Sequence, residues 1–340
     1  MKAKLSNFCD FLVFRQKLLS ELLKITFMKI LITGGAGFIG SHLTKLHLNK
    51  NDQVTVIDNF ITGSKKNLES EKNNQNLTVI EADIVNFDFS NLPSFDIIYD
   101  LASPASPKDF QQLSLEILKT NSLGLINILD FFIKSNSKTL VFSSTSEVYG
   151  DPLEHPQKES YFGHVNPVGL RSCYDEGKRF AEALIMAYFR KYHKDIRIAR
   201  IFNTYGPFMK KNDGRVVSNF INQAINNQSL TIYGKGLQTR SFCYVSDIVI
   251  GLYLLAITPK LDGEIINFGN QNEKTILEIA DIIKKLTQSQ SKIVFETIGQ
   301  DDPKRRCPDI TKAKKLLNWQ PKIGLEEGLK ETIKYFRELI

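Results

Sequence analysis

Residues 29–40 read KILITGGAGFIG, which joins a short apolar run to four glycines within seven residues. A short apolar run that ends in glycines is typical of a buried parallel strand, and the residues from Gly40 to Leu48 then follow a helical period. Gly35, Gly37 and Gly40 form the pattern G-x-G-x-x-G between that strand and that helix. Glycines at such a junction allow a tight turn and let backbone N–H groups and the helix N-terminus approach a pyrophosphate. The stretch therefore predicts a strand, a phosphate-binding turn and a helix.

The strand pattern recurs along the chain. Apolar runs that fit strands cover residues 54–58, 78–83, 96–101, 139–143, 196–202 and 264–268, and helical periodicity covers 114–134, 275–286 and 325–339. Strands that alternate with helices predict an α/β fold with a Rossmann-type, doubly wound parallel sheet. After Asn203 the alternation decays into loops broken by glycine and proline, so we expect a smaller C-terminal substrate-binding domain there.

These patterns also suggest domain limits. We expect residues 28–204 to form a dinucleotide-binding domain to which 237–270 return, and we expect 205–236 and 271–340 to form the second domain. Residues 1–27 form an N-terminal extension whose apolar residues fall on one face of a helix. We expect this extension to dock on the domain or on a partner subunit, with peripheral membrane association as the alternative. No apolar run approaches the ~20 residues of a transmembrane helix, so we expect no transmembrane segment.

The amino-acid composition of the chain limits the kinds of ligand and partner that it is expected to bind. The formal net charge is +7, but the lysines are scattered and no nucleic-acid-binding motif is present. We therefore expect a small anionic ligand and no nucleic acid. The four cysteines are far apart, which favours a reducing compartment, and we expect a cytoplasmic enzyme. The five histidines lack metal-ligand spacing, so we expect no metal site.

The second predicted strand ends in an acidic residue that indicates which dinucleotide cofactor binds. Asp58 lies 18 residues after Gly40, where a carboxylate can bind ribose hydroxyls and would repel a 2′-phosphate. The sequence therefore predicts an NAD site, the alternative being a glycine-rich turn with a satisfied strand-end aspartate. We assign to this site Gly34, Gly37, Phe38, Ile39, Gly40, Asp58, Asn59, Asp83 and Ile84.

A tyrosine and a lysine form a candidate catalytic pair. Tyr174 and Lys178 are four residues apart, on one face of a predicted helix. Lys178 is expected to stabilise tyrosinate and to lower the phenol's pKa from its usual value of about 10. A tyrosine tuned in this way can remove a hydroxyl proton while NAD accepts a hydride. The pair follows the hydroxyl-rich run 143–150 by about 30 residues, in a position to serve a sugar oxygen. A solvated surface pair is the alternative.

Several motifs in order carry a family resemblance. They are LASPASP at 101–107, STSEVYGDP at 144–152, GHVNP at 163–167, CYDEGKR at 173–179, NDGRVVSNF at 212–220, QTR at 238–240 and QDDP at 300–303. From residue 28 to 340 the chain resembles the extended short-chain dehydrogenase/reductase family, and within it the UDP-glucuronate decarboxylases. The resemblance implies a UDP-sugar substrate, NAD as cofactor, and a homodimer built on helix 114–134 and the Tyr174 helix. The alternative for these helices is that their apolar residues only pack on the sheet.

The resemblance also implies roles for individual residues. Thr145, Tyr174 and Lys178 match the catalytic triad, and Glu147 matches the glutamate near C5 and the carboxylate of the sugar. Ser146 stands where sugar 4,6-dehydratases carry aspartate, and Arg306 resembles the arginine that binds the substrate carboxylate. The family has positions that contact the nucleotide sugar or hold the site, and these resemble Lys119, Asn127, Tyr188, Asn203, Arg215 and Arg240 of this chain. Thr204 resembles a position that contacts the cofactor.

Two departures from the family pattern and several rival functions remain. Phe208 stands where arginine is frequent in the family, and Cys307 stands where lysine is common, so the affinity for an anionic substrate is in question. A nucleotide-sugar 4-epimerase or a 4,6-dehydratase would share the fold and the cofactor. So would a decarboxylase variant that releases a 4-keto pentose or makes a branched one. Outside the enzymes, a regulator that binds NAD without turnover is the alternative.

Overall fold

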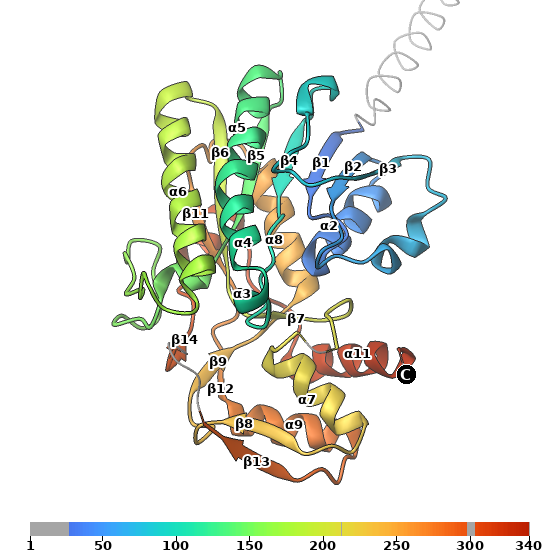
Figure 1. The fold of residues 1–340 in the computed structure, drawn as a ribbon, viewed down its shortest axis with the longest axis vertical. Coiled ribbons are helices and arrows are strands. Elements are labelled where there is room, and N and C mark those ends of the chain that lie inside the picture. Colours follow the sequence, from blue (N-terminus) through green and yellow to red (C-terminus); the bar gives the residue numbers. More distant parts are fainter. Residues whose placement is uncertain (1–26, 212, 298–302, 340) are drawn as a thin grey trace, which may run out of the picture.

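The computed structural model describes residues 27–211, 213–297 and 303–339. Its centre is a seven-stranded parallel sheet with the order β11-β6-β5-β4-β1-β2-β3 (Figure 1). The strands are β1 (Lys29–Thr33), β2 (Gln53–Asp58), β3 (Leu77–Glu81), β4 (Ile97–Asp100), β5 (Thr139–Thr145), β6 (Asp195–Ile201) and β11 (Ile265–Phe268). Each begins and ends within two residues of the run predicted from the sequence. The expected α/β Rossmann-type fold is confirmed.

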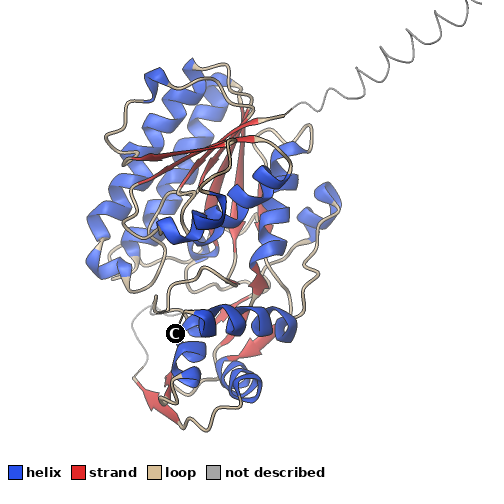
Figure 2. Ribbon diagram, turned by 90° about the vertical axis from the view of Figure 1, so that its right-hand side faces the viewer, coloured by secondary structure: helices blue, strands red, loops and turns tan. Residues whose placement is uncertain are grey.

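Helices cover both faces of this sheet (Figure 2). One face packs on α2 (Phe38–Asn49), α8 (Val245–Ile257) and α10 (Thr311–Leu317), and the other packs on α5 (Leu125–Lys134) and α6 (Ser172–Tyr192). Side chains alternate between the faces, so Ile30 and Ile32 join the first core while Leu31 joins the second. Burial on both faces explains why the inner strands are mainly apolar, whereas the edge strand β3 is largely exposed.

The helix predicted over 114–134 is interrupted. It consists of α4 (Ser114–Lys119), a π-helical turn over Thr120–Gly124 and α5. Inside the turn, the side-chain amide of Asn121 donates to the carbonyl of Ile117 (2.9 Å) and to the hydroxyl of Ser103 (2.9 Å). The turn thus ties the helix to the loop after β4. A shorter helix, α3 (Asp109–Gln112), precedes α4.

A second group of elements lies beyond the carboxyl ends of the sheet strands (Figure 1). Its helices α7 (Val216–Ile225), α9 (Ile276–Thr287) and α11 (Leu325–Glu338) share a core that includes Phe220, Ile279 and Ile333. Short strands complete it, namely β7 (Thr204–Tyr205), β8 (Leu230–Tyr233), β9 (Thr239–Ser241), β10 (Cys243–Tyr244), β12 (Glu273–Thr275), β13 (Ile293–Glu296) and β14 (Arg305–Arg306). They pair as β10-β7, β12-β9-β14 and β13-β8.

The limits proposed for the two domains stay a prediction, and residues 1–26 of the expected extension lie outside the described residues. Within the part of the chain that the structure covers, no helix is both long and apolar enough to cross a membrane.

Candidate active site

A cavity of about 870 Å³ lies at the carboxyl ends of the sheet strands. The segments that follow β1, β2, β4, β5 and β6 line one side of it, and residues of α7, β8 and β9 line the other. In open α/β sheets this edge is the usual place for ligands. The volume suits a ligand larger than a single sugar, because drug-sized pockets span roughly 300–1,000 Å³.

The glycine-rich turn forms a cradle in this cavity. Gly34 has a φ of +69°, and a Cβ there would lie 2.8 Å from the carbonyl carbon of Leu101. A Cβ on Gly40 would lie 2.2 Å from the carbonyl oxygen of Gly34, a contact that no side chain can make. The backbone between them, with Gly37 and Phe38, lines the cavity at the N-terminus of α2. These amides and the helix dipole suit a pyrophosphate.

Asp58 closes the cradle at the end of β2. Its carboxylate accepts hydrogen bonds from the backbone amides of Ala36 (2.9 Å) and Phe60 (2.8 Å). Burial raises the pKa of Asp58, and the two amide bonds oppose that shift. The side chain is therefore held in one orientation at the cavity wall, where it can accept from ribose hydroxyls. The remaining expected cofactor residues also line the cavity, namely Ile39, Asn59, Asp83, Ile84 and Thr204.

The candidate catalytic tyrosine also lines this cavity. Tyr174 is in the first turn of α6, where its ring stacks on Phe110 with centroids 5.0 Å apart. Its hydroxyl interacts with that of Thr145, at the end of β5. Lys178 lies one turn further along α6, is almost fully buried, and donates from Nζ to the carbonyl oxygen of Ser143 (2.8 Å). Tyr174, Thr145 and Lys178 thus meet at one wall, as the sequence predicted.

Burial opposes the effect that Lys178 is expected to have on the pKa of the tyrosine, and that effect stays a prediction. Burial raises the pKa of Tyr174 to about 12, against which the contact with Thr145 acts weakly. Burial also lowers the pKa of Lys178 to about 8, although Asp100 opposes this shift. Burial is thus the largest influence on the pKa of both groups, and Lys178 donates to the Ser143 carbonyl.

Glu147 carries a negative charge beside this wall. Burial would raise its pKa, but Arg306 and Arg171 lower the pKa to about 2. Arg171 Nη2 lies 2.5 Å from Oε2, and Arg306 Nη1 lies 3.1 Å from Oε1. Arg306 also donates to the Ser146 hydroxyl (2.9 Å) and to the carbonyl of Gly150 (2.9 Å). Glu147 is consequently a carboxylate at neutral pH, and it can act as an acceptor but not as an acid.

The sequence analysis missed two residues beside Glu147. Arg171 lines the cavity and approaches Asp175 at 3.9 Å, one turn along α6. Burial and the charge of Glu147 raise the pKa of Asp175 to about 8. Both residues flank Tyr174, so a search for charges at helical spacing around the tyrosine could have found them. The buried environment that keeps Asp175 protonated is not visible in the sequence.

Asp175 predicts a dependence of stability on pH. Between its ordinary pKa of 3.8 and about 8, the folded chain keeps a proton that the unfolded chain has lost. Stability therefore falls as pH rises through this window. In Asp175→Asn this loss should shrink, so the melting temperature should fall less than in the wild type between about pH 5 and about pH 8. Asp262→Asn, at an exposed aspartate away from the cavity, is the control. Equal losses in the wild type and Asp175→Asn would contradict this role.

Comparison with known proteins places the chain in a family. Residues 31–332 match the family model described as GDP-mannose 4,6 dehydratase. UDP-glucuronic acid decarboxylase 1 of Danio rerio is 52% identical over 312 residues, covering 92% of this chain and 73% of that protein. The chain belongs to the extended short-chain dehydrogenase/reductase family. The family resemblance seen in the sequence is confirmed.

Other members of the extended short-chain dehydrogenases/reductases agree with this placement. UDP-glucuronic acid decarboxylase 1 of Arabidopsis thaliana is 49% identical, covering 92% of this chain and 71% of that protein. Among solved structures, UDP-glucuronic acid 4-epimerase from Bacillus cereus, in complex with UDP-glucuronic acid and NAD, has a TM-score of 0.85 at 31% identity. That match covers 92% of this chain and 100% of the epimerase. UDP-glucose 4-epimerase from Thermotoga maritima, with UDP-glucose, has a TM-score of 0.84 at 31% identity, covering 92% and 99% of the two chains.

The residues expected by family resemblance to contact the sugar divide into two groups. Ser146, Asn203, Arg215 and Arg240 line the cavity. The others are not among the described residues that line it, namely Lys119, Asn127, Tyr188 and Arg306.

Each member of the second group has another position. Asn127 donates to the carbonyls of Ile84 (3.0 Å) and Val85 (2.9 Å) and so fixes the loop after β3. Tyr188 donates to Asp130 (2.7 Å) between α6 and α5, and Lys119 is exposed at the end of α4. Arg306 binds Glu147 instead of facing the cavity. In this structure Asn127 and Arg306 hold neighbouring segments in place, and their contact with the sugar stays a prediction.

Proposed function

We propose that this chain decarboxylates UDP-glucuronate to UDP-xylose and carbon dioxide, with NAD as its cofactor. The observation that carries the proposal is an ionised Glu147, held by Arg171 and Arg306 beside the wall formed by Tyr174 and Thr145. The hydroxyl of Ser146 accepts from Arg306 at the position where dehydratases of this family carry an acidic group. Curated relatives about 50% identical over some 90% of the chain bear the name UDP-glucuronic acid decarboxylase.

The residues of the cavity fit NAD. The glycine cradle leaves no room for a Cβ where a pyrophosphate would approach, and Asp58 places a carboxylate against the ribose position. The negative charge of the same Asp58 carboxylate would repel the 2′-phosphate of NADP. When bound, NAD supplies a reversible acceptor for the hydride on C4 of the sugar.

The chain's own residues then handle protons and charge. Tyr174, as its phenolate, removes the proton of the 4-hydroxyl, with Thr145 beside it and Lys178 behind it. Burial in the chain by itself disfavours that form, and the positive charge of bound NAD would favour it. A 4-ketone is β to the C5 carboxylate, so carbon dioxide can leave while its electrons delocalise into the ketone. Arg171 and Arg306 compensate the charge of Glu147, so the substrate carboxylate can lie beside this group without net repulsion. Glu147 can also accept a hydrogen bond from the water that returns a proton to C5.

Product analysis tests this function. Purified protein incubated with UDP-glucuronate should release carbon dioxide and form UDP-xylose without added NADH, as followed by NMR. Nucleotide released on denaturation should be NAD rather than NADP. Accumulation of UDP-galacturonate instead would establish a 4-epimerase, the function of the Bacillus cereus structure that this fold matches. A released 4-keto pentose would identify a truncated reaction.

We further propose that the enzyme is a cytoplasmic homodimer. Leu115 and Leu123, on α4 and the π-helical turn, are 64% and 51% exposed, and Phe180 on the adjacent α6 is 49% exposed. Apolar side chains gathered on neighbouring helices favour contact with a second copy.

The proposed dimer predicts that a charged side chain placed on this apolar face weakens the association of the two copies. Leu123→Glu should shift the mass measured by light scattering from that of a dimer towards that of a monomer, because the carboxylate would lose its water in the contact. Leu153→Glu, at a leucine 80% exposed in a loop, is the matched control and should leave the mass unchanged. A Leu123→Glu protein that keeps the wild-type mass would remove this face from the assembly.

A further inference from the structure

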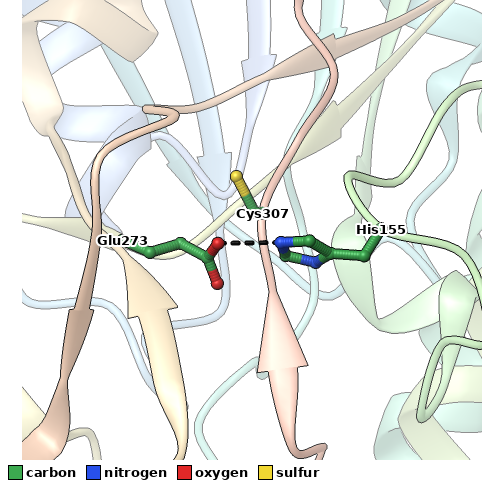
Figure 3. Close-up of side chains that lie close together, drawn as sticks. All are labelled: His155, Glu273 and Cys307. Atoms are coloured by element: carbon green, nitrogen blue, oxygen red, sulfur yellow. Dashed lines mark hydrogen bonds and ion pairs between the residues drawn. The ribbon is translucent and has the colours of Figure 1, made fainter.

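A histidine, a glutamate and a cysteine come together outside the cavity (Figure 3). His155, Glu273 and Cys307 are each on a different segment, and one potential ligand atom of each lies within 4.8 Å of the others. Nε2 of His155 is 2.8 Å from Oε2 of Glu273, and the sulfur of Cys307 lies beside this pair. None of the three lines the cavity among the described residues. The spacing of these residues in the sequence predicts no metal site, but the fold brings them together.

The existing contacts leave ligand capacity unused. Among the described residues, Nδ1 of His155 is buried without a hydrogen-bond partner. The thiol of Cys307 is buried, touches the Ser241 hydroxyl, and has only long contacts to the carbonyls of Gln271 (3.6 Å) and Pro308 (4.0 Å). Glu273 Oε1 accepts from the Thr239 hydroxyl (2.6 Å), while Oε2 faces the histidine. A cation would therefore replace weak thiol contacts and the His155–Glu273 hydrogen bond, next to Arg305 Nη2 at 3.8 Å from Oε2.

The segments that carry the cluster are already fixed to one another. Cys307 and Gln157 exchange two hydrogen bonds, since the backbone amide of Gln157 donates to the carbonyl of Cys307 (2.9 Å) and the backbone amide of Cys307 donates to side-chain Oε1 of Gln157 (2.9 Å). Gln157 is two residues from His155. Glu273 begins β12, which pairs with β9, and β9 also pairs with β14 directly before Cys307. Three ligands on a prearranged frame lower the entropy lost on binding.

We propose that His155, Glu273 and Cys307 form a site for a divalent transition metal such as zinc, with water in the fourth position. The thiolate and imidazole donors favour zinc or cobalt over magnesium and calcium, which prefer oxygen. Ligand atoms ~2.0–2.1 Å from a tetrahedral zinc lie roughly 3.3 Å apart, so the histidine and glutamate need only separate slightly. Binding releases the thiol proton of Cys307 and breaks the His155–Glu273 hydrogen bond.

The site would act on the active site through the sheet β12-β9-β14. Arg240 of β9, which lines the cavity, is paired in register with Arg306 of β14, which binds Glu147. A metal at the end of β14 holds these two strands and the loop of His155 together. We therefore expect the metal to stabilise the frame on which both arginines lie.

Cobalt supplies a direct test. Untagged metal-free protein titrated with Co²⁺ should develop the near-ultraviolet absorption of a thiolate–cobalt bond, saturating at one cobalt per chain, and Zn²⁺ should displace it. Cys307→Ser should abolish the band, and His155→Gln should weaken zinc affinity by at least about tenfold. Zinc should raise the melting temperature of the wild type but not of Cys307→Ser.

Matched variants separate this site from other metal binding. Cys243→Ala and His164→Gln change a buried cysteine and an exposed histidine outside the cluster, and both should keep the band and the affinity. A wild type without the thiolate–cobalt band would overturn the proposal. So would a band that survives in Cys307→Ser, because the thiolate would then lie elsewhere. Since no readout is turnover, failure of the decarboxylase proposal would leave this test intact.

Discussion

Tyr174→Phe should lower kcat with UDP-glucuronate by about 10²- to 10⁴-fold, the range in which a positioned acid or base contributes. The variant loses the only group by which Tyr174 can take the proton of the 4-hydroxyl. Its ring can keep the stacked contact with Phe110, so the fold and the cofactor cradle should remain. Turnover, NAD content and melting temperature should be measured on the same preparation. We expect only turnover to change strongly.

Another tyrosine of the same helix supplies the control. Tyr192 lies at the end of α6, is 40% exposed and does not line the cavity. Tyr192→Phe should therefore retain wild-type turnover. If Tyr174→Phe also kept it, the proposed proton transfer through this phenol would be wrong. Loss of NAD together with turnover would instead assign Tyr174 to cofactor retention.

Arg306→Met should lower the free energy of unfolding by about 3–5 kcal/mol, the cost of removing one partner from a buried ion pair. The side chain of Arg306 is 1% exposed and that of Glu147 is 18% exposed, so solvent compensates little. The variant also leaves the carbonyl of Gly150 and the hydroxyl of Ser146 without this donor. Urea unfolding at neutral pH measures the loss, and turnover should fall because Glu147 loses its orientation.

The pairing partner provides a double-mutant test. In Glu147→Gln/Arg306→Met the carboxylate that lost Arg306 is gone, although Arg171 also loses its ion pair, so only part of the lost stability should return. Arg305→Met is the matched control, because that side chain is 58% exposed and its change should stay within about 0.5 kcal/mol. Additive losses in the double variant would mean that Arg306 stabilises by packing and not by pairing with Glu147.

Acid pH gives a second readout of the same pair. The pKa of Glu147 is lowered from 4.5 to about 2, so its contribution to stability is present above about pH 4.5 and lost as pH falls towards 2. In Arg306→Met the pKa of Glu147 should rise, and the acid loss over this window should be smaller than in the wild type.

The central sheet was predictable because each strand can be recognised from its own few residues. Every strand of the sheet except the edge strand β3 is largely buried, so it is a mainly apolar run whose limits hold within two residues. The cofactor cradle was predictable for the same reason, since the glycines and Asp58 lie within two consecutive strand ends. The prediction that Tyr174 and Lys178 share a helix face needed only helical spacing.

The remaining features depend on distant parts of the chain. Strand β14 has two residues and exists only because it pairs with β9. The contact between Arg306 and Glu147 joins positions 159 residues apart, so the sequence suggested a substrate contact instead. The π-helical turn escapes a search for 3.6-residue periodicity, and the effect of burial on Tyr174 and Lys178 requires the surrounding core.

The late position of β14 bears on how the enzyme matures during synthesis. The nucleotide cradle is encoded within the first sixty residues, and the parallel sheet around it needs nothing after Phe268. The guanidinium of Arg306, which compensates the charge of Glu147, is synthesised only after every strand of that sheet, and domains form from the N-terminus onward. A nascent chain can thus form its nucleotide cradle before the charge of Glu147 is compensated, so the frame of the site precedes its chemistry.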